Sequence, residues 1–426
     1  MLLGGLFSLT AVSLFGQPQT ITDYAAPGPH AIGERVVTIA VSPGRSYQAT
    51  LYYPAAAPGG LNAPLDPGAM PYPAIAFGHG YLQSVSSYAS TLSHLASWGF
   101  IVIAPSSESG LFPNHSRFAD DLRDSLTWLT WENEIITSFL FGGVDTANFG
   151  VSGHSMGGGA SLLAASRDDR IRAVANLAAA ETNPSAITAA ASITRPVQLI
   201  AGDEDAITPP GNHQIPMYAA ANPARQLPVI QGGWHCGFQD SSFPIGCDSG
   251  SLPRAEQLAE TRQLLTTWFL LYLRGEEERW YEVWGPTARQ NALVSFTADD
   301  GIGLEPQTQL GEIVAGERLT YTVTISNTGV LTTAYALALE SAWPAGLTTT
   351  ETPLLGPGTA VSLSLWVEPT LAGQETLTLT ARSLYDGGTT DWANASTNAS
   401  EPIGPPPPPE YTLFLPQLLR EADQGD

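Results

Sequence analysis

The stretch that most constrains how this 426-residue chain can fold is the glycine-rich segment 148–160, which contains Gly-His-Ser-Met-Gly at 153–157. A short apolar run with strand character precedes this pentapeptide, and an alanine- and leucine-rich run with helix character follows it. A serine between a strand and a helix, flanked by small residues, is typical of a strained turn that holds the hydroxyl clear of the backbone. The helix dipole would also favour negative charge developing beside Ser155. The segment therefore predicts a nucleophilic serine at a strand-to-helix turn.

The segments on either side of this turn alternate between buried strands and amphipathic helices. Strands are expected at 36–41, 47–53, 73–77, 101–104, 149–151, 171–177, 197–201 and 226–230, and helices around 88–98, 118–129, 160–165 and 253–274. The first two strands are separated by a turn and predict a hairpin. Continuous apolar strands that alternate with helices predict an α/β fold with a mostly parallel sheet, covered by helices on both faces.

The composition changes near residue 300, where helical patterns end and threonine, serine and glycine become more frequent. Short strands with period-two alternation follow, at 319–325, 361–365 and 376–380. They predict a smaller all-β sandwich. In composition this part resembles the immunoglobulin-like modules appended to secreted bacterial proteins, which implies an immunoglobulin-like sandwich. We therefore expect a catalytic domain at 21–295, an accessory domain at 300–400, and a proline-rich spacer with a tail at 401–426. The tail is compatible with an attachment segment, a docking strand or disorder.

The chain begins with an apolar stretch that resembles part of a secretory signal, so we expect a signal peptide at 1–20 and a secreted or cell-surface protein. The stretch lacks a basic n-region, since the first arginine is Arg35; a misplaced start, a poor signal and a buried helix or strand remain alternatives. Export would allow a disulfide between Cys236 and Cys247, the alternative being two free thiols. The spacing of these cysteines is not typical of a zinc site.

Charge excludes several classes of function. The net charge of −23 argues against nucleic acid as a partner, because phosphate contacts need basic residues. All 17 basic residues are arginine, which excludes chemistry that requires a lysine.

A nucleophilic serine needs a base, and the base needs an acid to orient it. The segment Gly-Asp-Glu-Asp at 202–205 follows an expected strand, and we prefer Asp205 as the acid over its rivals Asp203 and Glu204. His235 follows the next expected strand, which gives the order Ser, Asp, His that is typical of one class of hydrolase. It is therefore the expected base.

The remaining site residues are expected in the loops beside these three. The backbone N–H groups of Met156 and Tyr81 are the expected oxyanion donors, with Gly80 as the alternative to Tyr81. The residues expected to line the substrate pocket are Gly80, His79, His154 and Trp234, and His213 is a further possibility.

Four segments carry a family resemblance: 153–159, Gly80-Tyr81, 202–205 and Gly-Gly-Trp-His at 232–235. Through them, residues 35–292 resemble α/β-hydrolases, in the neighbourhood of dienelactone hydrolase-like proteins, chlorophyllases and bacterial cutinases. In cutinase-like polyester hydrolases an aromatic residue corresponds to Tyr81, and an aromatic clamp follows the next strand. This chain has Ala-Ala-Ala-Glu-Thr at 178–182 instead. The departure bears on the substrate and not on the enzyme class.

The resemblance implies a secreted serine esterase that acts through an acyl-serine intermediate, without cofactor or metal. Its substrate would be a small or polymeric carboxylic ester, and the sandwich would be a spacer or would contact a cell surface or an extracellular polymer. We expect a monomer. The alternatives are a peptidase or acyltransferase with the same residues, and a non-catalytic surface or binding protein built on the same fold.

Overall fold

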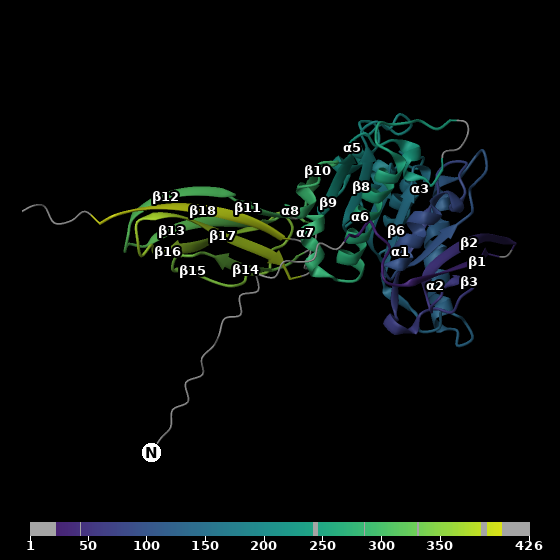
Figure 1. The fold of residues 1–426 in the computed structure, drawn as a ribbon, viewed down its shortest axis with the longest axis horizontal. Helices are drawn as coiled ribbons and strands as arrows, with labels where there is room; N and C mark the ends of the chain where they lie inside the picture. Colours follow the sequence, from purple (N-terminus) through teal and green to yellow (C-terminus); the bar gives the residue numbers. More distant parts are fainter. Residues whose placement is uncertain are drawn as a thin grey trace, which may run out of the picture.

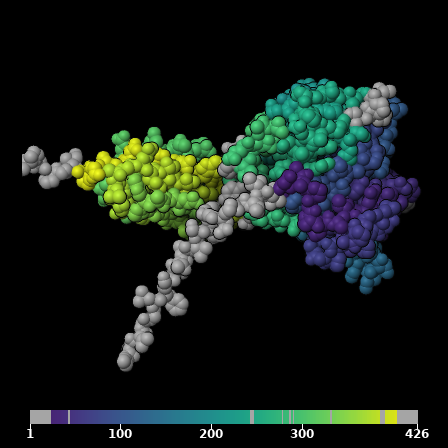
Figure 2. Space-filling model, viewed as in Figure 1, coloured from purple at the N-terminus to yellow at the C-terminus, as the bar shows by residue number. Residues whose placement is uncertain are grey.

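The computed structural model describes residues 23–42, 44–241, 246–284, 286–329, 332–384 and 390–402. The expected signal peptide at 1–20 lies outside these residues, as do the proline run and the tail from 403 onward. The described residues form a larger α/β part and a smaller all-β part (Figures 1 and 2). No helix in these ranges is both long and apolar enough to span a membrane.

The α/β part is built on one sheet in the order β10-β9-β8-β7-β6-β4-β5-β2-β1-β3. Its strands are β1 (Ala31–Ser42), β2 (Arg45–Ala55), β3 (Gly60–Leu61), β4 (Tyr72–Gly78), β5 (Ile101–Pro105), β6 (Val144–His154), β7 (Ile171–Leu177), β8 (Val197–Gly202), β9 (Arg225–Ile230) and β10 (Val294–Asp299). Strands β4 to β9 are mutually parallel, while β1 and β2 form the expected hairpin and β10 pairs antiparallel with β9. The predicted mostly parallel sheet is confirmed.

Helices cover both faces of this sheet (Figure 1). The helices are α1 (Ala89–Ser97), α2 (His115–Glu134), α3 (Met156–Ala165), α4 (Ala186–Ala190), α5 (Gln214–Ala220), α6 (Arg254–Leu273), α7 (Trp280–Val283) and α8 (Pro286–Arg289). Alternate residues of β4 show the two layers. Ala74 and Ala76 share a core with α2 and α3, whereas Ile75 and Phe77 share one with α1 and α6. The strands read as continuous apolar runs because both faces are buried.

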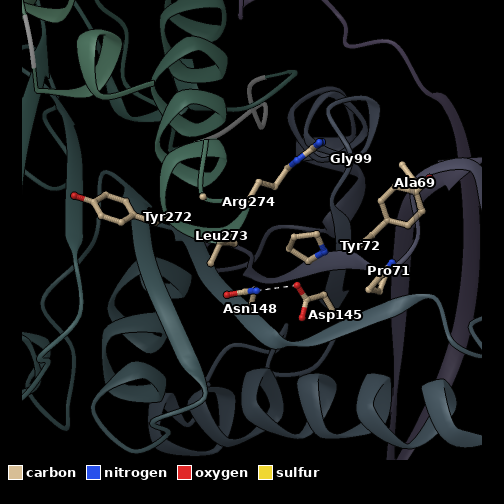
Figure 3. Close-up of a pocket in the computed structure, with 11 residues that line it drawn as sticks. Ala69, Pro71, Tyr72, Gly99, Asp145, Asn148, Tyr272, Leu273 and Arg274 are labelled. Atoms are coloured by element: carbon tan, nitrogen blue, oxygen red, sulfur yellow. Dashed lines mark hydrogen bonds between the residues drawn. The ribbon is translucent and has the colours of Figure 1, made fainter. Parts of the chain in front are cut away.

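The parallel strands bring distant segments to one edge of the sheet, where β4, β6, β8 and β9 end. The loops after these strands carry Tyr81, Ser155, Asp205 and His235. A separate cavity of about 350 Å³ lies where β4 begins and α6 ends, and Tyr72 and Arg274 line it (Figure 3). The four loops therefore gather at the carboxyl ends of the strands, which is where ligands bind in open α/β sheets.

The all-β part contains two four-stranded sheets, in the orders β11-β13-β16-β15 and β12-β18-β17-β14. Their strands are β11 (Ile302–Glu305), β12 (Thr308–Val314), β13 (Leu319–Asn327), β14 (Tyr335–Glu340), β15 (Ala345–Leu347), β16 (Ala360–Val367), β17 (Gly373–Ser383) and β18 (Thr390–Ser400). Residues from both sheets, such as Val323 and Leu379, form one shared core. The pairs are antiparallel except for β12 with β18. The expected immunoglobulin-like character and the boundaries of independent domains stay predictions.

Candidate active site

Ser155 occupies the strained turn between β6 and α3 that the pentapeptide predicts. Its backbone has φ 55° and ψ −119°, a conformation that a serine adopts at a cost. Glycines make the turn possible, because a Cβ on Gly157 would lie 2.1 Å from the carbonyl oxygen of Gly78. A Cβ on Gly153 would lie 2.4 Å from the backbone of Gly157. The small residues therefore allow the elbow to press against the end of β4.

Asp205 and His235 form a buried hydrogen-bonded pair. Nδ1 of His235 lies 2.8 Å from Oδ2 of Asp205. The carboxylate also accepts the backbone N–H groups of Ile207 and Thr208, and the Thr208 hydroxyl lies 2.8 Å from Oδ2. Burial by itself would raise the pKa of Asp205, but His235 and the Thr208 donors outweigh it and hold that pKa below its ordinary value. The acid is therefore ionised and the histidine carries its proton on Nδ1.

The two rival acids have other partners. The carboxylate of Asp203 accepts the backbone N–H of Gly232. Glu204 accepts the backbone N–H and the hydroxyl of Ser251. Both side chains therefore brace neighbouring loops, and only Asp205 of this segment contacts His235.

Ser155 and His235 face the same pocket, which has a volume of about 120 Å³. Its lining residues in the described part of the chain are Gly80, Tyr81, Gln83, His154, Ser155, Ile207, His235, Cys236, Gln239, Gly246 and Cys247. Within that part, no hydrogen bond joins the Ser155 hydroxyl directly to His235. Catalytic hydrogen bonds are often long or poorly aligned until a substrate is bound. Nε2 of His235, the ring nitrogen that does not contact Asp205, is the atom left to accept the serine proton.

The expected oxyanion donors flank this pocket. Met156 is the first residue of α3, where backbone N–H groups have no partner inside the helix. Tyr81 lines the pocket, and its hydroxyl donates to the carbonyl of Leu111, which fixes the tyrosine to the loop after β5. Gly80 lines the pocket as well, and its N–H donates to the hydroxyl of Tyr88. That N–H is therefore occupied, which favours Tyr81 over Gly80.

Two expected pocket residues lie behind the pocket wall. His79 is buried, with Nε2 2.8 Å from the carbonyl oxygen of Ser107, so it links the loops after β4 and β5. Trp234 is also buried; its indole N–H donates to the carbonyl of Leu252 and Arg254 stacks on its ring. Neither side chain is among the described residues that line the pocket, because both hold loops together, and their role in substrate binding stays a prediction. His154 does line the pocket, and His213 accepts the N–H of Glu181.

The expected disulfide is present between Cys236 and Cys247 and forms part of the pocket wall. Asp248, which follows it, accepts the backbone N–H groups of Ala206, His235 and Cys236. The disulfide therefore holds the Asp248 carboxylate in a position where this carboxylate joins the acid loop to the histidine loop.

Sequence reasoning missed Thr208, Asp248 and several lining residues. A signal for Thr208 exists, since an aspartate that accepts N–H groups two and three residues onward is a common turn motif, and Thr208 stands at the third position. Ile207, Gln83 and Gln239 have no comparable local signal, because they reach the pocket only through the tertiary fold.

Comparison of the chain with known proteins identifies the family to which it belongs. The family described as PET hydrolase-like matches residues 14–248. Cutinase est1 of Thermobifida alba is 34% identical over 147 residues, which is 34% of this chain and 47% of that relative. Cutinase of Thermobifida fusca (strain YX) is 31% identical over 147 residues, 34% of this chain and 46% of the relative.

A third relative is the bis(hydroxyethyl) terephthalate hydrolase of Streptomyces coelicolor, which is 27% identical over 195 residues, 46% of this chain and 56% of that protein. The chain thus spans about half the length of the curated relatives it matches. The family match itself extends over more than half of the 426 residues and includes the elbow, the acid and the histidine. The chain therefore belongs to the PET hydrolase-like family.

Proposed function

We propose that the protein is a secreted serine hydrolase that cleaves carboxylic esters, with Ser155 as nucleophile, His235 as general base and Asp205 as the acid. The observation that carries the proposal is the buried Asp205–His235 hydrogen bond of 2.8 Å in a pocket that also holds Ser155. The strained conformation of Ser155 supports it, because such strain is typical of a serine whose hydroxyl must stand clear of the backbone.

The reaction would proceed in two steps. The Ser155 oxygen attacks the ester carbonyl carbon while its proton passes to Nε2 of His235, and the N–H groups of Met156 and Tyr81 stabilise the resulting oxyanion. Collapse of this intermediate breaks the bond to the alcohol, which leaves with the proton from His235. Water then attacks the acyl-serine with His235 again as base, releases the acid and restores the serine.

We propose that the substrates are esters with apolar groups, polymeric esters included. The pocket of about 120 Å³ suits a small acyl group, so the rest of a longer substrate would lie outside it. The nearby surface is apolar: Ile207 lines the pocket, Tyr81 is 46% exposed, and Leu111 and Phe112 are 65% and 93% exposed. Such exposed apolar groups are typical of binding surfaces. The names of the relatives, cutinase and bis(hydroxyethyl) terephthalate hydrolase, agree with this substrate class.

The proposal of secretion rests on the disulfide, because such bridges persist in oxidising compartments. The segment 1–20, which would carry the signal, lies outside the described residues. Recovery of the mature protein from the medium, with its amino terminus determined, would test this directly.

The test of the reaction is hydrolysis of p-nitrophenyl acetate, butyrate and octanoate by the wild type and by Ser155→Ala. Loss of a triad nucleophile costs on the order of 10⁶ in kcat, so the variant should be inactive. Ser166→Ala, at the other end of α3, is the matched control and should keep its turnover. An active Ser155→Ala protein would refute the assignment. Release of monomers from a polyester film by the wild type would extend the substrate class to polymers.

A further inference from the structure

A buried tyrosine hydroxyl lies between the loops of the proposed active site. Tyr88 ends the short 3-10 helix η2 (Val85–Tyr88) and is fully buried. Its hydroxyl oxygen lies 3.1 Å from the backbone N of Gly80, 2.8 Å from Nδ1 of His154 and 3.4 Å from Nε2 of Gln239. Gly80 and Gln239 lie in the segments that follow β4 and β9, and His154 is the last residue of β6.

The donors around this hydroxyl determine where its proton goes. Gly80 and Gln239 both offer N–H groups, so the Tyr88 oxygen accepts from them and donates its own proton to His154. Burial raises the pKa of Tyr88, which keeps that proton on the oxygen. His154 then carries its proton on Nε2, which donates to the carbonyl oxygen of His235 at 3.2 Å. Burial and then the neighbouring His235 lower the pKa of His154, so its ring is neutral.

The resulting chain of hydrogen bonds runs from Gly80 N–H through Tyr88 and His154 to His235 C=O. Three members of this chain adjoin the proposed reacting groups: Gly80 precedes Tyr81, His154 precedes Ser155, and the carbonyl belongs to the proposed base. There is no room for a side chain at Gly80 beside this chain of hydrogen bonds. A Cβ on Gly80 would lie 2.9 Å from the Tyr88 hydroxyl and 3.1 Å from Nδ1 of His154. The rings of His154 and His235 also pack together, with centroids 4.5 Å apart.

We propose that Tyr88 and His154 are positioning residues that hold the oxyanion loop, the serine elbow and the histidine loop in one arrangement. The inference rests on the proposed esterase function, since it assigns these residues a role in that same site. Neither ring has to touch the reacting atoms. Tyr88 holds the N–H of Gly80, in the peptide immediately before the one that carries the Tyr81 N–H, and His154 holds the main chain of His235 while its own backbone leads into Ser155. A misplacement of such groups by about 1 Å is enough to lower a rate by orders of magnitude.

Tyr88→Phe tests the inference, because it keeps the aromatic ring and removes only the hydroxyl. We expect kcat on p-nitrophenyl butyrate to fall about tenfold or more with KM unchanged, since the oxyanion site and the base are affected more than ground-state binding. His154→Leu should have a similar effect. His154→Gln, which can still offer an N–H to the His235 carbonyl, should recover part of the rate. The double variant Tyr88→Phe/His154→Leu should lose little more than either single variant, because both act through one chain of hydrogen bonds.

Tyr72→Phe is the matched control. Tyr72 is also buried, and its hydroxyl donates to the carbonyl of Asp66 at 3.0 Å, at the opposite end of β4 (Figure 3). This variant should lower the melting temperature and leave kcat unchanged. If Tyr88→Phe behaves in the same way, with its kcat within twofold of the wild type, the hydroxyl is merely structural and the inference is wrong. Additive losses in the double variant would also overturn it.

The experiment separates this inference from the proposed function. A wild type that hydrolyses no ester and does not react with a fluorophosphonate probe contradicts the function, and the inference falls with it. A wild type that is active, beside a Tyr88→Phe variant that is equally active, contradicts the inference alone.

Discussion

The carboxylate of Asp205 is surrounded by donors, and the side chain of Thr208 is the one that also reaches the histidine. The Thr208 oxygen lies 2.8 Å from Oδ2 of Asp205, 3.0 Å from Nδ1 of His235 and 3.0 Å from the carbonyl oxygen of Ala178. It thereby joins the acid loop, the base and the end of β7. Burial raises the pKa of Asp205, His235 lowers it most strongly, and the Thr208 hydroxyl is among the contacts that lower it further, so that the pKa lies below its ordinary value.

Thr208→Val should lower kcat about fivefold, because it removes one hydrogen bond of about 1 kcal/mol from the acid and keeps the shape of the side chain. Steady-state turnover of p-nitrophenyl butyrate measures the effect. Thr130→Val is the control, since that threonine donates to a backbone carbonyl within α2, away from the pocket. A Thr208→Val protein with unchanged kcat would show that Asp205 is positioned by its backbone donors alone.

At the residue scale, the sequence predicts the loops of the site better than the contacts between them. Ser155, Asp205 and His235 each follow an apolar strand, so local pattern and chain order suffice to single them out, although their catalytic roles stay predictions. Tyr88 reads only as an apolar position of a helix. Its hydroxyl acquires a role because β4, β6 and β9 end at the same edge of the sheet, and no local pattern contains that information.

At the scale of elements, the continuous apolar runs of the central strands and the long amphipathic helices were predictable. Helix α2 extends a few residues beyond the expected 118–129 at both ends, because its terminal turns are polar and carry no periodicity. Helix α6 agrees with the expected 253–274 to within one residue at each end. The strand β10 was not predicted. It is an edge strand with one partner, and four of its six residues are polar or small, so its hydrophobic pattern is weak.

Helix α1 is held against α6 by a histidine that should make stability depend on pH. Nε2 of His94 lies 2.9 Å from the carbonyl oxygen of Tyr24 and 3.1 Å from the hydroxyl of Thr266. Burial, with a smaller effect of Arg262, lowers the pKa of His94 to about 4. An unfolded chain would bind this proton with an ordinary pKa of about 6.5. Between these values the unfolded state binds more protons, so the free energy of unfolding falls as the pH falls.

His94→Gln should remove this dependence while it keeps a donor for the Tyr24 carbonyl. We expect the variant to lose less stability than the wild type between pH 7 and pH 4, by up to about 3 kcal/mol. Chemical denaturation at a series of pH values measures the difference. His115→Gln, at the start of α2, is the control and should follow the wild type. Parallel pH profiles for His94→Gln and the wild type would contradict the explanation.

At the scale of the whole molecule, the α/β part and the sandwich have separate cores. Two clusters of buried residues line the faces of the large sheet, and a third cluster fills the sandwich without sharing a residue with either. Asp299 ends β10 and pairs with Arg225, Ile302 begins β11, and the rings of Trp280 and Trp392 meet edge to face with centroids 6.0 Å apart. The pocket residues that the structure describes all come from the α/β part.

A chain that ends at Asp300 should therefore fold and keep kcat and KM on p-nitrophenyl butyrate within about twofold of the full chain, because no pocket residue or core residue of the α/β part is removed. Its melting temperature should fall slightly, since Trp280 loses the ring of Trp392. Circular dichroism establishes folding, and Ser155→Ala in the shortened chain gives the background rate. A folded but inactive shortened chain would show that the sandwich supports the site. If turnover is retained on the soluble ester and drops only on a polyester film, the sandwich contributes by holding the enzyme at the polymer surface.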